Sequence, residues 1–135
     1  MSEYDFSCYV LKYEVESIRG LKYKKGLFAS QDGNVVPLVW NYQHFDQETV
    51  LGHAVLENKP EGVYAYCHLS NTPNGKIALE LMSDTVMSLG PFITSYKVED
   101  KHIVKGRISS CSLMLERIDD DEAYHPILNK DKRLS

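Results

Sequence analysis

The sequence is short of cysteines, long apolar runs and basic residues, and each shortage excludes a class of protein. Its three cysteines, Cys8, Cys67 and Cys111, are odd in number and form no close pair. This spacing argues against a disulfide framework or a zinc site. No stretch approaches the roughly 18 apolar residues that a membrane-spanning helix needs. The N-terminus lacks a basic start followed by an apolar run, so we expect no secretory signal and no membrane partner.

Positive charge is also scarce, because 15 Lys and Arg residues stand against 19 Asp and Glu residues, for a net charge of -4. Nucleic-acid binding needs clustered Lys and Arg side chains, so we expect no nucleic-acid partner. The one basic run, from Lys22 to Lys25, is best interpreted as a solvated strand or turn edge. His68, His102 and His125 show no metal-ligand spacing, and there is no glycine-rich phosphate loop. We therefore expect no metal and no cofactor.

The patterns that are present are mainly those of β-strands. Segments rich in aromatic and β-branched residues alternate with turn signals over residues 4–13, 35–41, 49–57, 62–69, 86–98 and 102–116. The run from Asn58 to Gly62 contains Pro and Gly, which favour a tight turn between two of these strands. A chain of 135 residues with 43% apolar residues can bury a core without metals or disulfides.

One helix is predicted after residue 72. Asn71 and Thr72 offer capping side chains, and Pro73 suits the first helical position. Gly75 weakens the first turn, so we expect a short helix of roughly two to three turns. Gly90 and the proline after it should bend or bulge the strand that follows.

These elements predict a mainly β protein with one or more short helices, of the α+β class. The expected architecture is a six- to seven-stranded β-barrel or a strongly curved sheet with the helix packed on it. We expect one domain over residues 1–118, followed by a loosely ordered charged tail over residues 119–135. The acidic run from Asp119 to Glu122 lacks the glycine turn of a calcium loop and is interpreted as a solvated end.

Several segments resemble the prohead protease family of tailed phages (caudoviruses), whose fold is similar to that of the herpesvirus assemblin proteases. The resemblance covers residues 4–118. It is carried by the opening Tyr4-Asp-Phe-Ser, a central block and the last predicted strand. The central block comprises Val36-Pro-Leu-Val-Trp-Asn, Val50-Leu-Gly-His-Ala-Val-Leu-Glu-Asn and Glu61-Gly-Val-Tyr-Ala-Tyr, and the last strand contains Lys105-Gly-Arg-Ile and Ser112-Leu-Met-Leu.

The resemblance implies a serine nucleophile, a histidine base and a third polar group that orients the histidine. At the corresponding positions this chain has Tyr42, Gly90 and Ser110. Tyrosine is a weak base at neutral pH, glycine has no nucleophile, and serine carries no charge. The three replacements predict a catalytically degenerate member, a pseudo-protease rather than an enzyme.

A shifted register offers an alternative active site. His44 lies two residues after Tyr42 and Ser88 lies two before Gly90, so each shares a strand face with the position it would replace. A His44–Ser88 dyad, assisted by Ser110 or Ser112, would make the chain an active serine endopeptidase. The pair Cys67-His68 is rejected as a catalytic pair, because neighbours on a strand point to opposite faces. His53 is interpreted as structural.

The function we expect is therefore a non-catalytic, prohead-protease-like phage protein with a structural or binding role in capsid or virion assembly. Its expected partner is capsid protein, scaffold protein or a second copy of itself, in the host cytoplasm or in the prohead or virion. The first alternative is an active maturation protease that uses the displaced residues. The second is a phage or prophage protein that binds a host factor.

Overall fold

The computed structural model describes residues 4–16, 20–40, 50–84, 87–114, 125–126 and 129–130. Six long strands carry the fold. They are β1 (Phe6–Lys12), β3 (Val35–Trp40), β4 (Val50–Lys59), β5 (Gly62–Leu69), β6 (Ser88–Glu99) and β7 (His102–Met114). The short elements are the strands β2 (Lys22–Tyr23), β8 (His125–Pro126) and β9 (Asn129–Lys130) and the 3-10 helix η1 (Ala29–Gln31). The α-helix α1 spans Pro73–Asp84.

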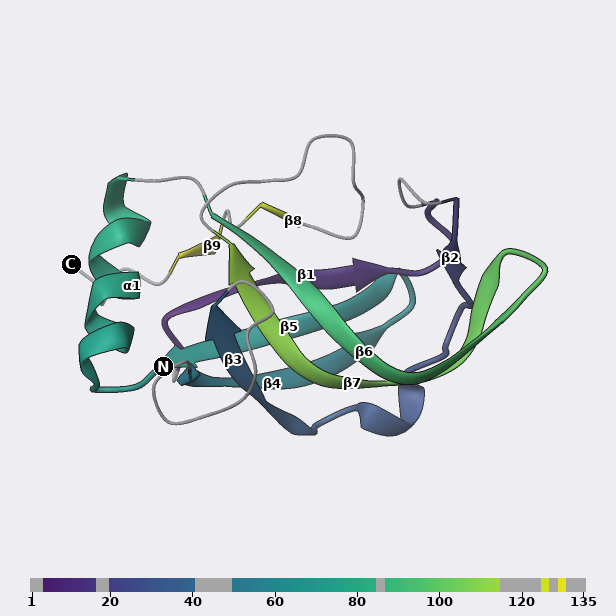
Figure 1. The fold of residues 1–135 in the computed structure, drawn as a ribbon, viewed down its shortest axis with the longest axis horizontal. Coiled ribbons are helices and arrows are strands. Elements are labelled where there is room, and N and C mark those ends of the chain that lie inside the picture. The colour runs from purple at the N-terminus through teal and green to yellow at the C-terminus, as the bar shows by residue number, and fades with distance from the viewer. Residues whose placement is uncertain are drawn as a thin grey trace.

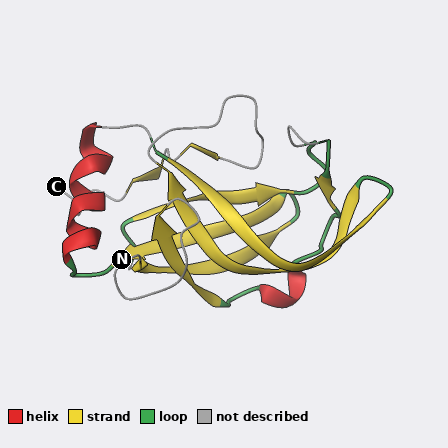
Figure 2. Cartoon of the chain, in the orientation of Figure 1, coloured by secondary structure: helices red, strands yellow, loops and turns green. Residues whose placement is uncertain are grey.

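The strands in this part of the chain form one mixed sheet that curls into a half-barrel (Figures 1 and 2). The order across the sheet is β8-β6-β7-β3-β4-β5-β1-β9, and β2 pairs with β7. Most neighbours are antiparallel, whereas β7 is parallel to both β2 and β3. The helix α1 lies at one end of the half-barrel and the tip of the β6–β7 hairpin at the other (Figure 1). The predicted fold class, mainly β with a strongly curved sheet and a short helix, is confirmed.

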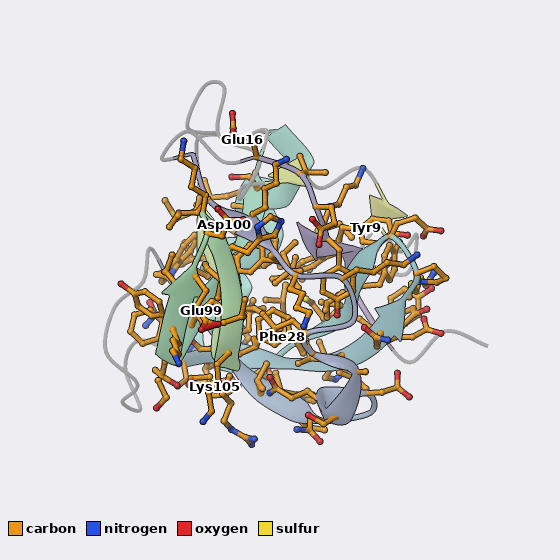
Figure 3. The ribbon with its side chains drawn as sticks, turned by 90° about the vertical axis from the view of Figure 1, so that its right-hand side faces the viewer. Tyr9, Glu16, Phe28, Glu99, Asp100 and Lys105 are labelled. Carbon is orange, nitrogen blue, oxygen red and sulfur yellow. The ribbon has the colours of Figure 1, made fainter. Side chains whose placement is uncertain are left out.

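The hydrophobic core fills the inside of the curl. Side chains from β1, β3, β4, β5, β6 and β7 alternate between this interior and the outer face, as a two-residue period requires. Phe28 projects from the loop before η1 and lies between the strands in the end-on view (Figure 3). The largest fully buried side chains are Phe6, Leu11, Phe28, Leu38, Leu51, Leu56, Met87, Leu89, Ile108 and Leu113.

The β4–β5 hairpin forms where the turn residues predicted it. Lys59 pairs with Gly62, which leaves Pro60 and Glu61 as the two turn residues. Gly62 also allows β1 to approach closely, because a Cβ at this position would lie 2.2 Å from the carbonyl oxygen of Leu11. Any side chain at residue 62 would therefore push these neighbouring strands apart.

The helix α1 begins with the predicted cap. The Thr72 hydroxyl accepts a hydrogen bond from the backbone N–H of Gly75 at 3.1 Å, and Pro73 takes the first helical position. The helix has 12 residues, slightly more than the expected two to three turns. Gly75 is needed rather than merely tolerated, since a Cβ there would lie 2.1 Å from the carbonyl oxygen of Ser70.

The β6–β7 hairpin is long and irregular. Its pairing shifts register between Phe92 and Ile93, one residue after the Gly90-Pro91 pair that predicted a bend. Further shifts occur between Thr94 and Val98, and Ser95 adopts a positive φ of 55°. Such bulges add twist to a ladder, and here they accompany the bend that carries the hairpin around the half-barrel.

A buried glutamine completes the backbone pairing of β7. On the edge facing away from β6, β7 pairs with β2 at His102 and Ile103 and with β3 only from Cys111 onward. Between these stretches the Gln31 side chain takes the place of a strand. Its Nε2 donates to the carbonyl oxygen of Ile108 at 3.0 Å, and its Oε1 accepts from the Ile108 N–H at 2.8 Å.

We predict that Gln31→Met destabilises the fold strongly. Methionine has a similar size, but it leaves the N–H and C=O of Ile108 unpaired in a buried site, and each unsatisfied group costs about 1–3 kcal/mol. Urea unfolding should show a lower free energy of unfolding, and hydrogen exchange of the Ile108 amide should accelerate. Lys76→Met, on the exposed face of α1, is the matched control and should change the free energy of unfolding by less than about 0.5 kcal/mol. Equal stability of the two variants would contradict this role for Gln31.

A histidine–carboxylate contact joins the hairpin tip to the end of β1. The ring of His102 contacts the carbonyl oxygen of Asp100 through Nδ1 at 3.0 Å and Glu14 through Nε2 at 2.8 Å. Only the protonated ring has an N–H on each nitrogen and can donate to both acceptors. These two acceptors raise the pKa of His102, with the Asp100 carbonyl contributing most. The backbone N–H of Lys25 and the His102 ring lower the pKa of Glu14.

The contact should stabilise the fold in a limited pH window. The raised pKa of His102 contributes stability that is full below the unfolded value of about 6.5 and is lost as the pH rises through the folded value. The lowered pKa of Glu14 contributes stability that is full above about 4.5 and is lost as the pH falls through its folded value. We therefore expect the stability difference between wild type and His102→Gln to peak between these values. A difference that is independent of pH would contradict this account.

Candidate functional site

The candidate site residues on β6 and β7 lie side by side in the sheet. Gly90 pairs with Ser112, Ser88 pairs with Met114, and Phe92 pairs with Ser110. Directly paired residues of an antiparallel ladder share a face, so these six positions lie on one face of the hairpin. The sequence placed Ser88 and Gly90 on a common face, and the register adds Ser110 and Ser112 from the neighbouring strand.

This common face is the one turned away from the core. The intervening pairs Leu89–Leu113 and Pro91–Cys111 point inward, since Leu89, Leu113 and Cys111 belong to the core cluster. On β3, Val39 pairs with Ser112 and is buried but lies outside that cluster. We call Ser88, Gly90, Ser110 and Ser112 the serine patch of the outer face.

The serine patch is buried although it lies on the outer face. The exposed fraction is 0% for Ser88 and Ser112 and 9% for Ser110. Ser88 and Ser112 are also engaged in interactions within the chain. A nucleophile must reach its substrate and needs a base within hydrogen-bond distance. The outer-face positions of residues 88–92 and 110–114 carry hydroxyl groups, Met114, Phe92 and a glycine, and none of these is a base.

The remaining predicted residues, Tyr42 and His44, lie outside the residues that the structure describes. The strand that precedes them is placed, because Trp40 pairs with Leu113 at the end of β3. Residues 41–49 therefore follow a strand that borders the serine patch. Whether a tyrosine or a histidine completes the site stays a prediction from the sequence.

One neighbour of the serine patch was not foreseen. The short strand β8 pairs antiparallel with the start of β6, with His125 opposite Leu89 and Pro126 opposite Ser88. By register His125 is thus opposite a core-facing residue rather than opposite Ser88 or Gly90. No sequence pattern predicts this pairing, because a two-residue strand has no detectable alternation. Both β8 and β9 belong to the range that we expected to be a loosely ordered tail.

The cysteines and the adjacent histidine do not form a second site. Cys67 faces the core and is fully buried, whereas His68 pairs with His53 on the outer face, as the alternation predicted. All three thiols are free and buried. Burial raises the pKa of Cys111 to about 12 and raises those of Cys8 and Cys67 as well. Neutral buried thiols are inert as nucleophiles and as metal ligands.

The two outer-face histidines, His53 and His68, lie close together beside Asp5. The rings of His53 and His68 are 5.3 Å apart, and His68 Nδ1 lies 3.8 Å from an Asp5 oxygen. That Asp5 oxygen also accepts the backbone N–H of Leu69 at 2.6 Å. No cluster of three or more metal-ligating side chains occurs among residues with a described position.

Tyrosines cover the outer face of β1 and β5. Tyr9 contacts Tyr64, Tyr64 contacts Tyr66, and Tyr66 contacts Tyr4, with ring centroids 5.0–5.2 Å apart. Two of their hydroxyl groups are fixed by carboxylates. The Tyr9 hydroxyl donates to Glu61 and the Tyr66 hydroxyl donates to Glu57, both at 2.6 Å. These bonds raise the pKa of each phenol to about 12. The phenols of Tyr9 and Tyr66 are therefore neutral at physiological pH.

Comparison with protein-family models, with curated proteins and with solved structures gave no match. Over the described part of the chain, α1 is too short and too polar to span a membrane. The residues themselves therefore carry the functional argument.

The buried thiols give a direct test of this arrangement. We predict that native protein at pH 8 reacts with almost none of its cysteines when treated with Ellman's reagent, because burial keeps the thiols neutral and inaccessible. In denaturant, all three cysteines should react. Rapid reaction of one thiol in the folded protein would mean that a cysteine is accessible and would reopen a cysteine-based site.

Proposed function

We propose that this protein is a non-catalytic relative of the tailed-phage prohead proteases with a structural or binding role in capsid or virion assembly. The expected partner is capsid protein, scaffold protein or a second copy of the chain. The proposal rests on the resemblance over residues 4–118 and on the chemistry of the serine patch. A curled, mainly β half-barrel with one helix is compatible with it, although a fold alone does not determine a function.

The observation that carries the proposal is the composition of the serine patch. The position that the resemblance assigns to the nucleophile is Gly90, which is buried and paired with Ser112. The position assigned to the orienting group is Ser110, whose hydroxyl has no charge with which to hold a histidine. A serine protease must transfer a proton from its nucleophile to a base during attack. The side chains of Ser88, Ser110 and Ser112 are hydroxyl groups, and Gly90 has none, so the four residues of the patch themselves include no base.

Ser88 is a poor substitute for the missing nucleophile. Ser88 is fully buried. It is displaced from Gly90 by two residues, about 6–7 Å along the strand. Catalysis tolerates displacements of only a fraction of that distance. We therefore expect Ser88 to contribute to packing rather than to peptide hydrolysis.

The test is co-expression of this chain with the major capsid protein from the same genome. We expect the capsid protein to co-purify and to keep its full intact mass. Ser88→Ala should change neither result, because Ser88 has no catalytic role in this proposal. Gly90→Ala serves as a second variant at the position that the resemblance assigns to the nucleophile. It should likewise leave the capsid protein uncut.

Two outcomes would overturn the proposal. Cleavage of the capsid protein at one site, with the cut lost in Ser88→Ala and in His44→Ala, would identify an active maturation protease. Failure of the capsid protein and the scaffold protein to co-purify, with a host protein recovered instead, would favour the host-factor alternative.

A further inference from the structure

The outer face of the β6–β7 hairpin changes character beyond the serine patch. Phe92 follows Gly90 on this face and is 46% exposed. The next pairs along the hairpin are Thr94 with Arg107 and Lys97 with Lys105. Ile108 is buried in the core, so Arg107 beside it and Lys105 two residues away face outward, together with their partners Thr94 and Lys97. The outer face thus passes from buried hydroxyls to an exposed ring and then to three cations. We call Lys97, Lys105 and Arg107 the basic strip.

The cations of the basic strip are poorly balanced within the chain. Lys97 and Lys105 lie directly opposite each other, an arrangement that destabilises an antiparallel pair through like-charge repulsion. One carboxylate, that of Glu99, lies 3.6 Å from Lys97. Over the residues that the structure places, no ion pair is formed by Lys105 or Arg107. A strip of this kind favours an incoming anion.

The charge of the hairpin is opposite to that of the rest of the chain. Residues 92–108 contain four Lys and Arg residues and two Asp and Glu residues, for a net charge of +2. Since the whole chain carries -4, the remainder carries -6. The hairpin lies on a different side of the half-barrel from Tyr9, with Glu99 and Lys105 near its tip (Figure 3). A long polyanion would extend past the strip and meet the negative remainder, so a short anionic segment fits better.

The geometry of the strip matches an extended peptide. Lys105 and Arg107 are two residues apart on β7, which is about 6–7 Å. Alternate side chains of an extended segment have the same spacing. Within the described ranges, β7 is the one strand that pairs with β6 from Gly90 to Glu99. Phe92, Tyr96 and Val98, all on β6, are three of the exposed large apolar side chains.

We infer that the basic strip binds an extended segment of a partner protein that carries carboxylates at alternate positions. The carboxylates would meet Lys105, Arg107 and Lys97, and an apolar side chain of the segment would contact Phe92. This inference deepens the proposed binding function by naming the chemistry of the partner. It rests on that proposal only in taking the partner to be a protein.

The direct test uses a rhodamine-labelled octapeptide of alternating glutamate and valine, with fluorescence anisotropy as the readout. We expect it to bind wild-type protein, with an affinity that falls as salt is raised. The double variant Lys105→Gln, Arg107→Gln should bind it about five- to tenfold more weakly, as expected for the loss of two exposed ion pairs. Phe92→Ala should also weaken binding. Circular dichroism verifies that each variant is folded.

Matched controls decide whether the strip is specific. Lys76→Gln removes a cation from the exposed face of α1 and should leave the affinity unchanged. A peptide of alternating glutamine and valine should bind much more weakly than the glutamate peptide. Equal binding of the two peptides, an equal effect of Lys76→Gln, or preferential binding of single-stranded oligothymidylate would each overturn the inference.

The inference and the proposed function can fail separately. If capsid protein co-purifies equally with wild type and with the double variant, the strip is not the partner contact and the inference fails while the proposed function stands. If the glutamate peptide binds through the strip but neither capsid nor scaffold protein co-purifies, the chemistry of the strip stands and the assembly role fails.

Discussion

The two hydrogen bonds between Gln31 and the backbone of Ile108 satisfy the buried stretch of β7 that neither β2 nor β3 reaches. β7 is bordered by β6 on one edge, whereas on the other edge β2 and β3 pair only with its two ends. Ile108 is fully buried between those ends, so its peptide groups need partners that no strand supplies. The side-chain amide of Gln31 provides both a donor and an acceptor. Because Gln31 pairs with Ile108, β7 can pair with β2 at one end and with β3 at the other without leaving buried backbone groups unsatisfied between them. The sheet can therefore curl.

The curl decides which side chains form the candidate site. Leu89, Cys111 and Leu113 face the core, so the residues between them must face outward. The serine patch is the consequence, and its burial on an outer face distinguishes it from the exposed side chains farther along the hairpin. Hydroxyl groups suit such a place, because they can be buried at low cost when they are hydrogen-bonded. A charged base would require a partner or access to water, and the described part of the patch contains neither.

Local features of the fold could be predicted from the sequence, and features that depend on distant contacts could not. The alternation of apolar residues indicated all six long strands, and the Thr72-Pro73 pair indicated the start of α1. By contrast, β2, β8 and β9 have two residues each, which is too short for any pattern. The role of Gln31 depends on a residue 77 positions away. In the candidate site, the shared face of Ser88 and Gly90 could be predicted from their spacing of two residues. Their burial, and the pairing that places Ser110 and Ser112 on the same face, depend on contacts between strands.

If this chain descends from a protease, as we propose, the loss of its catalytic groups removes the main reason to keep a cleft open to solvent but leaves the reasons to bind a chain. A protease must hold an extended segment beside its nucleophile, and the interactions that do so are backbone pairing, apolar contact and charge, none of which requires a nucleophile. On this hairpin the closed serine patch and the exposed basic strip occupy successive parts of one face, separated by Phe92. The repulsion between Lys97 and Lys105 costs stability in the free protein, and an anionic partner would relieve it. Relief of this repulsion on binding would add to the affinity for an anionic partner.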